Sequence, residues 1–282
     1  MPKVTSLELI NEARKLNRAV GAFNVYNLES VKAVSEASRE TGMGVIFQIT
    51  SSAAKYGGLK NIYDLAMNQI ELTGIRAAVH LDHGPSLEMV HECLEMGFSS
   101  VMFDGSSLPY DSNVESTAKA AKQAHESGAT CEGELGRLEG SEGEISVSAK
   151  DKIYTNPDEA ARFVDETHVD LFAVAIGNAH GFYKGEPHID FERLNKIRQK
   201  VSVPLVLHGA SGIPDESIRK AITLGISKIN IDTELRFAFM QGIEKYLNAN
   251  PGTAAAREAL MDGRELMKKK TIEKIKLFNP GM

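Results

Sequence analysis

The stretch "AAVHLDHGP", residues 77–85, decides how this chain is expected to fold. It starts as an apolar run typical of a buried strand and ends abruptly in His80, Asp82 and His83, before a Gly-Pro turn. Core packing does not require such an ending, because polar groups cost free energy to bury unless they are paired. The stretch therefore predicts a buried strand whose carboxyl end carries chemistry.

Seven other short apolar runs alternate with longer helical patterns, at residues 20–25, 44–50, 99–105, 129–135, 170–177, 203–210 and 226–232. Near-continuous apolar strands that alternate with helices indicate parallel strands covered on both faces. Eight such units in a chain of this length favour a closed α/β fold, the (β/α)8 TIM barrel. An open, doubly wound sheet is the weaker alternative, because no G-x-G-x-x-G motif follows the first strand.

The chain of 282 residues is predicted to form a single TIM-barrel domain over 1–282, with extra C-terminal helices as an arm at about 234–276. We expect this arm to serve in subunit contacts of a homodimer or homotetramer. The formal net charge of −6 argues against a nucleic-acid or membrane surface. Two distant cysteines, and the lack of a signal peptide or a membrane-length apolar run, predict a cytoplasmic protein.

Side chains that can bind a metal or move a proton follow nearly every predicted strand, at the end where TIM-barrel enzymes place their active sites. Three of them are the histidines His83, His180 and His208. Three neutral imidazoles can hold one divalent ion, with zinc preferred, and leave a position open for substrate. The alternative is that each histidine caps its strand by bonding to nearby backbone.

Asp82 directly precedes one of these histidines and could exchange a proton with a bound hydroxyl. It could equally serve to orient an imidazole. His80 lies within the strand and is predicted to be a core residue or a support for the site.

Two glycine-bearing turns follow histidines, "HGFYKGEP" at 180–187 and "HGASGIP" at 208–214. Exposed backbone N–H groups beside a helix N-terminus bind anions, and phosphate sites of barrels commonly follow strands seven and eight. These turns, with residues 230–233, therefore predict a phosphate site to which Lys184 adds a cation. The alternative is that they are ordinary Gly-Ser turns.

Seven motifs carry a family resemblance: "GAFNVYNLE", "HLDHG", "SVMFDGS", "EGELG", "AVAIGNAHGFYKGEP", "LVLHGASGIP" and "KINIDTELR". Together they closely resemble the class II, zinc-dependent ketose-bisphosphate aldolases, which include fructose-1,6-bisphosphate and tagatose-1,6-bisphosphate aldolases. The resemblance implies reversible cleavage of fructose 1,6-bisphosphate to dihydroxyacetone phosphate and glyceraldehyde 3-phosphate, through a zinc-stabilised enediolate.

The resemblance also implies residue roles. His83, His180 and His208 would hold one catalytic Zn²⁺, and Asp104 and Glu134 a second divalent or monovalent cation. Asp82 would move the proton of the C4 hydroxyl, Glu142 in the long loop after the fifth strand would handle the enediolate proton, and Asn230 would complete the catalytic set. The phosphorylated ketose would be bound by Asn24, Ser51, Gly181, Lys184, Gly209, Ala210, Ser211, Asn230, Ile231, Asp232, Thr233, Arg236 and Arg257, the two arginines at its distal phosphate.

Three departures from the family pattern bear on the substrate. Glu139 replaces a glycine and Gly143 an acid in the long loop, and Ala255 replaces the Asp of an Asp-Pro-Arg motif. Asp232 resembles the fructose-bisphosphate members, because the tagatose-bisphosphate members often carry a small residue there. Tagatose 1,6-bisphosphate or another ketose 1-phosphate stays open as substrate, and so does a sugar-phosphate-binding barrel that lacks catalysis.

Overall fold

Eight parallel strands close into a barrel in the computed structural model, which describes residues 3–142, 145–147, 153–183 and 185–281. Around the barrel the strand order is β1-β10-β9-β8-β5-β4-β3-β2. The TIM-barrel prediction is thus confirmed, and each of the eight predicted runs contributes a strand. The strands are β1 (Val20–Asn24), β2 (Val45–Thr50), β3 (Ala77–Gly84), β4 (Ser100–Phe103), β5 (Thr130–Leu135), β8 (Leu171–Val174), β9 (Leu205–Leu207) and β10 (Ile226–Ile231).

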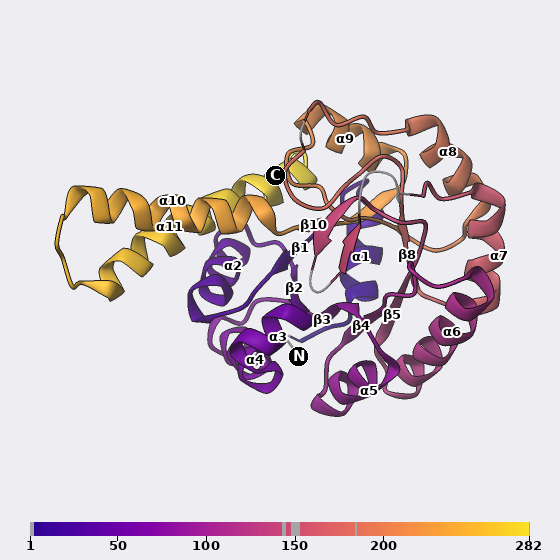
Figure 1. The fold of residues 1–282 in the computed structure, drawn as a ribbon, viewed down its shortest axis with the longest axis horizontal. Helices are drawn as coiled ribbons and strands as arrows, with labels where there is room; N and C mark the ends of the chain where they lie inside the picture. The colour runs from indigo at the N-terminus through magenta and orange to yellow at the C-terminus, as the bar shows by residue number, and fades with distance from the viewer. Residues whose placement is uncertain (1–2, 143–144, 148–152, 184, 282) are drawn as a thin grey trace.

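Helices surround the barrel (Figure 1) and begin and end at residues that the sequence marks clearly. In α2, for example, Asn27 and Ser30 form a capping box, and Gly42 ends the helix in the left-handed conformation. These helices are α2 (Leu28–Thr41), α3 (Ser51–Gly57), α4 (Leu59–Thr73), α5 (Leu87–Met96), α6 (Tyr110–Glu126), α7 (Pro157–Thr167), α8 (Phe191–Lys200) and α9 (Asp215–Thr223).

The barrel interior changes from apolar to polar along the strands. Helix α1 (Ser6–Arg14) packs Leu9 and Ile10 against Ile46, Ala78 and other residues near the strand starts. Because side chains alternate faces along a strand, the row that begins with Ala78 continues through His80 and Asp82. Polar side chains therefore fill the interior toward the carboxyl ends of the strands, where the site lies.

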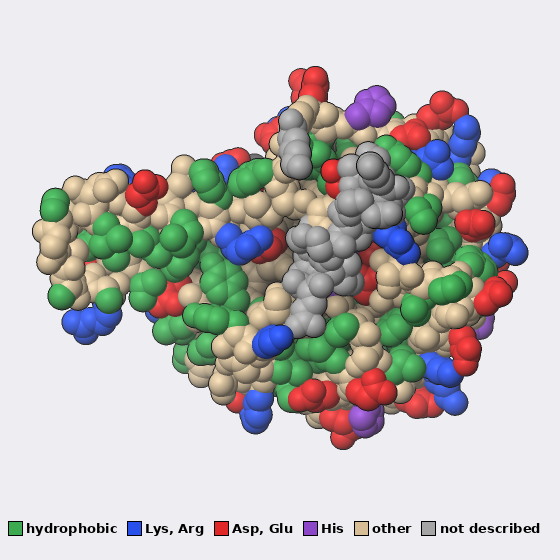
Figure 2. Space-filling view, viewed as in Figure 1, with side chains coloured by type: hydrophobic (Ala, Val, Ile, Leu, Met, Phe, Trp, Pro, Cys, Tyr) green, Lys and Arg blue, Asp and Glu red, His purple; other side chains and the backbone are tan. Residues whose placement is uncertain are grey.

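Helices α10 (Thr233–Ala249) and α11 (Ala256–Phe278) form a hairpin that projects from the barrel (Figure 1). This confirms the extra C-terminal helices. Hydrophobic side chains gather on the face of this arm seen in Figure 2, and four large ones are exposed: Phe237, Met240, Leu247 and Met261. None of the described helices is both long and apolar enough to cross a membrane.

The long loop after β5 is more regular than its composition suggests. It contains an antiparallel hairpin of β6 (Gly140–Glu142) and β7 (Ile145–Val147), where the sequence indicated only irregular chain. Strands of three residues are too short to show a hydrophobic period, so this hairpin could not be predicted from the pattern.

Candidate metal centre and active site

Three histidines from separate parts of the chain meet at the mouth of the barrel. His83 belongs to β3, whereas His180 and His208 follow β8 and β9. The ring centroid of His83 lies 5.2 Å from that of His180 and 4.7 Å from that of His208. One ring nitrogen of each histidine lies within 4.8 Å of the other two. This is the convergence that a shared metal ion requires.

A kink at the end of β3 explains how Asp82 and His83 can both serve the site. Neighbouring residues of a regular strand point to opposite faces. His83, however, has φ of 50°, a left-handed conformation that costs a residue other than glycine about 1–2 kcal/mol. The pairing of β3 with β4 also shifts between Leu81 and Gly84. The local strain therefore coincides with the residue that the sequence marked as a metal ligand.

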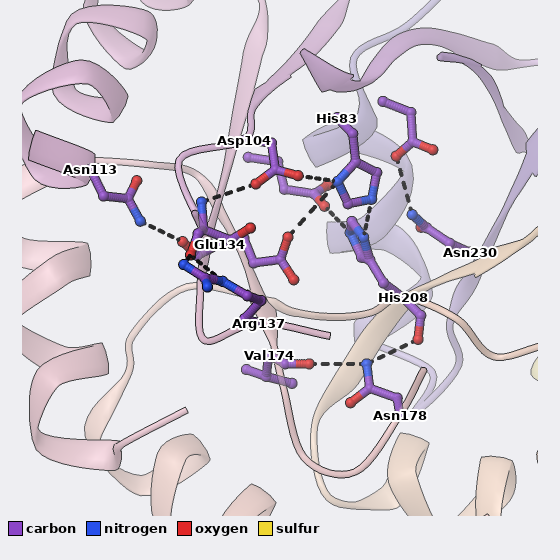
Figure 3. A network of polar contacts seen from close by, with 12 residues as sticks. His83, Asp104, Asn113, Glu134, Arg137, Val174, Asn178, His208 and Asn230 are labelled. Atoms are coloured by element: carbon purple, nitrogen blue, oxygen red, sulfur yellow. Dashed lines mark hydrogen bonds and ion pairs between the residues drawn. The ribbon is translucent and has the colours of Figure 1, made fainter. Parts of the chain in front are cut away.

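Carboxylates fix which nitrogen of two rings carries the proton (Figure 3). Nδ1 of His83 lies 2.6 Å from Asp104 Oδ2, and Nε2 of His208 lies 2.7 Å from Glu132 Oε1. An ionised carboxylate only accepts, so each of these nitrogens donates and the opposite nitrogen presents a lone pair. Those opposite nitrogens, His83 Nε2 and His208 Nδ1, are 2.9 Å apart. Two lone pairs this close repel unless they share a cation, so the arrangement fits a bound metal ion.

The pKa values are shifted in the direction that metal binding needs. Burial lowers the pKa of His208 and keeps its ring neutral. Burial raises the pKa of Glu132, but the Lys228 ammonium and His208 outweigh it, and the pKa stays well below its usual range. Burial likewise raises the pKa of Asp104, but its hydrogen bond with His83 and the attraction between them hold the pKa low. A neutral His208 beside an ionised Glu132 is the form in which a histidine binds a metal.

Beneath the histidines lies a buried ion pair that the sequence analysis did not assign to the site. Lys228 Nζ is 2.8 Å from Glu132 Oε2, and both side chains are 0% exposed. His80 lies beside them and bonds through Nδ1 to Ser100 Oγ at 2.8 Å, in agreement with a supporting role. The sequence held one signal for this pair, which is Lys228. A lysine inside a buried strand needs a charged partner.

Asp82 is fully buried, and two amide groups hold its carboxylate. Asn24 Nδ2 donates to Asp82 Oδ2 at 3.2 Å, and Asn230 Nδ2 donates to Asp82 Oδ1 at 3.3 Å. The oxygen of each of these amides is buried and has no hydrogen-bond partner among the residues that the structure describes. Both oxygens are thus available to accept hydrogen bonds from hydroxyl groups of a bound molecule.

A small hollow beside the histidines is lined by residues expected at the metal and phosphate sites: His180, Gly181, Gly209, Ser211, Asn230, Asp232 and Thr233. The Tyr183 hydroxyl ties two of its loops together, accepting from Ala179 N–H and donating to Gly209 O, each at 2.9 Å. Gly209 has φ of 59°, and a Cβ there would lie 2.2 Å from Ala179 O. Only glycine lets these two loops approach so closely.

Two ion pairs shape the start of α10, next to this hollow. Arg236 and Asp232 form a bidentate pair, with nitrogen–oxygen distances of 3.1 and 3.0 Å. Glu234, which the sequence analysis missed, accepts from Gly212 N–H at 2.7 Å and pairs with Lys274 Nζ at 2.8 Å. The turn after β9 is therefore anchored to both helices of the arm.

The remaining residues that were predicted for the site lie in several different elements. Ser51 begins α3 directly after β2, Ile231 is buried in β10, and the N–H of Ala210 donates to Asn230 O at 3.4 Å. Arg257 is exposed in the first turn of α11, at the far end of the arm (Figure 1), so a single copy of the chain does not bring it to the histidines. Lys184, Gly143 and the side chain of Glu142 lie outside what the structure describes.

The residues predicted for a second cation form their own cluster. His83, Asp104 and Glu134 each place a ligand atom within 4.8 Å of the other two. The His83 atom that faces both carboxylates is Nδ1, at 2.6 Å from Asp104 and 3.9 Å from Glu134. Orientation of His83 accounts for the place of Asp104 without a further ion, and the second cation stays a prediction.

Comparisons with known proteins agree with this geometry. The family model for class II fructose-bisphosphate aldolase matches residues 4–281. A fructose-bisphosphate aldolase of Thermus caldophilus is 41% identical, over 98% of this chain and 97% of the relative. The D-tagatose-1,6-bisphosphate aldolase subunit GatY of Klebsiella oxytoca is 39% identical, over 94% and 93%.

A solved structure points the same way. The crystal structure of the YdjI aldolase from Escherichia coli K12 is 35% identical and has a TM-score of 0.86, covering 98% of this chain and 97% of that chain. The structural match and the sequence matches extend over nearly the whole chain. They therefore include β3 and the segments after β8 and β9, which carry the three histidines. The chain belongs to the class II fructose-bisphosphate aldolase family, a family of aldehyde-lyases that are generally metal-dependent.

Proposed function

We propose that this protein reversibly cleaves fructose 1,6-bisphosphate to dihydroxyacetone phosphate and glyceraldehyde 3-phosphate, with Zn²⁺ held by His83, His180 and His208. The observation that carries the proposal is the close approach of His83 Nε2 and His208 Nδ1, 2.9 Å apart, at the mouth that also holds Asp82. Imidazole nitrogens suit zinc, and three protein ligands leave a position for substrate.

The reaction needs a group that polarises the C2 carbonyl and a base at the C4 hydroxyl. When bound, the metal ion supplies the first as a Lewis acid. Asp82 supplies the second: it takes the C4 proton during cleavage and returns it during condensation. Asn24 and Asn230 hold Asp82 by their N–H groups and turn their amide oxygens to the substrate hydroxyls. Glu142 is proposed to move the proton of the enediolate carbon.

The hollow beside His180 is proposed to take the phosphate of the dihydroxyacetone half. Small residues at its wall leave backbone N–H groups accessible, and Lys184 is proposed to add a cation. Ser51 and Arg236 are proposed to contact the substrate further out, and Arg257 the distal phosphate.

The metal requirement gives the first test. We expect dialysis against a chelator to abolish cleavage of fructose 1,6-bisphosphate, and added Zn²⁺ to restore it, because no side chain replaces the Lewis acid. A coupled assay for the triose phosphates measures this, with untreated protein as control. Turnover that survives complete metal removal would overturn the proposal. A protein that takes up no metal and cleaves no ketose even with added Zn²⁺, but binds phosphate tightly, would instead indicate a binding protein.

Tagatose 1,6-bisphosphate is the second candidate substrate, because a relative of similar identity is named for it. We expect kcat/KM to be highest for fructose 1,6-bisphosphate on a panel with tagatose 1,6-bisphosphate and other ketose 1-phosphates. Asp232 lines the hollow, and its carboxylate can bond a substrate hydroxyl and so distinguish the C4 epimers. Asp232→Ala should therefore reduce the preference between the two epimers by about 10–100-fold, as one hydrogen bond to a charged group is worth about 1.5–3 kcal/mol. An unchanged preference would exclude this role.

We also propose how the protein assembles and where it is located. The exposed apolar side chains of the arm favour subunit contacts in a homodimer or homotetramer. Cys93 and Cys131 are both buried and unbonded, which suits a reducing cytoplasm.

A further inference from the structure

We propose that the buried ion pair between Lys228 and Glu132 positions His208 and thereby sets how tightly the metal is bound. Lys228 is a positioning residue here, because it acts on the histidine only through Glu132. The inference rests on the proposed metal site and goes beyond it by assigning a function to a charge below that site.

The geometry makes Glu132 a bridge between two strands. Its Oε1 accepts from His208 Nε2 at 2.7 Å, and its Oε2 lies 2.8 Å from Lys228 Nζ. Glu132 is on β5 and Lys228 on β10, which are not neighbours in the barrel. The carboxylate therefore spans the interior, and it cannot rotate without losing one of these contacts.

Burial explains why the bridge needs a cation. His208, Glu132 and Lys228 are all 0% exposed, so water cannot replace a lost partner. A buried carboxylate without a counter-charge is strongly unfavourable. His80 Nε2 lies 3.9 Å from Glu132 Oε2, beyond hydrogen-bond distance, and burial holds the pKa of His80 well below its usual value. His80 is therefore neutral and supplies no counter-charge to Glu132 while Lys228 is present.

The same bridge determines the orientation of the His208 lone pair. Because Glu132 binds the Nε2 side of the ring, Nδ1 is turned toward His83 Nε2. Asp104 likewise binds Nδ1 of His83, which turns Nε2 of that ring toward His208. Loss of Lys228 should loosen Glu132, and with it the ring of His208, while leaving every proposed ligand in the chain.

The test is metal affinity, measured in the full chain by competition with a chelating indicator. Lys228→Met keeps a long side chain but removes the charge. We expect the Kd for Zn²⁺ to rise about 10–100-fold, the range found when a partner of a metal ligand is lost. We expect the visible spectrum of the Co²⁺-loaded variant to change as well. Leu194→Ala is the control: it replaces a buried side chain of α8, a helix outside the barrel, and should leave both readouts unchanged.

Three further variants keep the test decisive if Lys228→Met folds poorly. Lys228→Arg retains the charge and should stay within a few-fold of the wild-type Kd. Glu132→Gln, of nearly equal size, should raise the Kd like Lys228→Met. In the double variant the two effects should not add, because Lys228 acts through Glu132.

The outcomes separate this inference from the proposed function. Wild-type metal affinity in a folded Lys228→Met protein, wild-type affinity in Glu132→Gln, or additive effects in the double variant would overturn the positioning role alone. A wild-type protein that binds no divalent metal would overturn the proposed function as well.

Discussion

His83→Ala is expected to abolish both metal binding and cleavage. His83 supplies one of the three histidine ring nitrogens that lie within 4.8 Å of one another. Its Nε2 lies 2.9 Å from His208 Nδ1. The loss in metal affinity should exceed the roughly 10–100-fold effect of removing an outer partner, since a ligand itself is lost. Calorimetric titration of the metal-free protein with Zn²⁺ and the coupled cleavage assay measure the two losses.

His91→Ala is the matched control for this variant. His91 is exposed on α5, and the same substitution there should change neither metal affinity nor turnover. Alanine at position 83 also keeps the left-handed backbone conformation under strain, so far-ultraviolet circular dichroism should accompany the assay. A folded His83→Ala protein that binds Zn²⁺ as tightly as wild type would show that the facing nitrogens do not form the metal site.

The fold could be predicted from the sequence because barrel strands leave a strong pattern. Runs such as 170–177 and 203–210 are largely apolar, and each is followed by a turn signal and a helical period. The hairpin of β6 and β7 could not be predicted, because each strand has only three residues. Pro251-Gly252 lies between α10 (Thr233–Ala249) and α11 (Ala256–Phe278), because neither residue favours a helix interior.

The site was predictable where polar residues end strands and less so inside the barrel. His83 and His208 could be selected because imidazoles at strand ends have no packing purpose. The bridge from Lys228 through Glu132 depends on which interior side chains meet across the barrel, and that follows from strand stagger rather than from spacing in the sequence. The same holds for the salt bridge between Glu234 and Lys274, which lie on separate helices.

Asp82→Asn is expected to lower kcat for cleavage by about 10²–10⁴-fold, the usual contribution of a general base. The amide matches the carboxylate in size but cannot take the C4 proton. The fold should tolerate it, because Asn24 or Asn230 can rotate its amide and present its oxygen to the new N–H. KM should change little, because the hollow for the phosphate is formed by other residues.

The affinity for Zn²⁺ distinguishes whether Asp82 acts as the general base or orients a metal ligand. The rings of His83 and His208 already have carboxylate partners in Asp104 and Glu132, so Asp82→Asn should leave the Kd for Zn²⁺ near the wild-type value. Asp64→Asn, at an exposed carboxylate paired with Lys60, is the control and should leave kcat unchanged. A weakened metal affinity together with a proportionate loss of kcat would identify Asp82 as a support for the metal. A kcat within tenfold of wild type would exclude Asp82 as the base, because another group would then have to take the C4 proton.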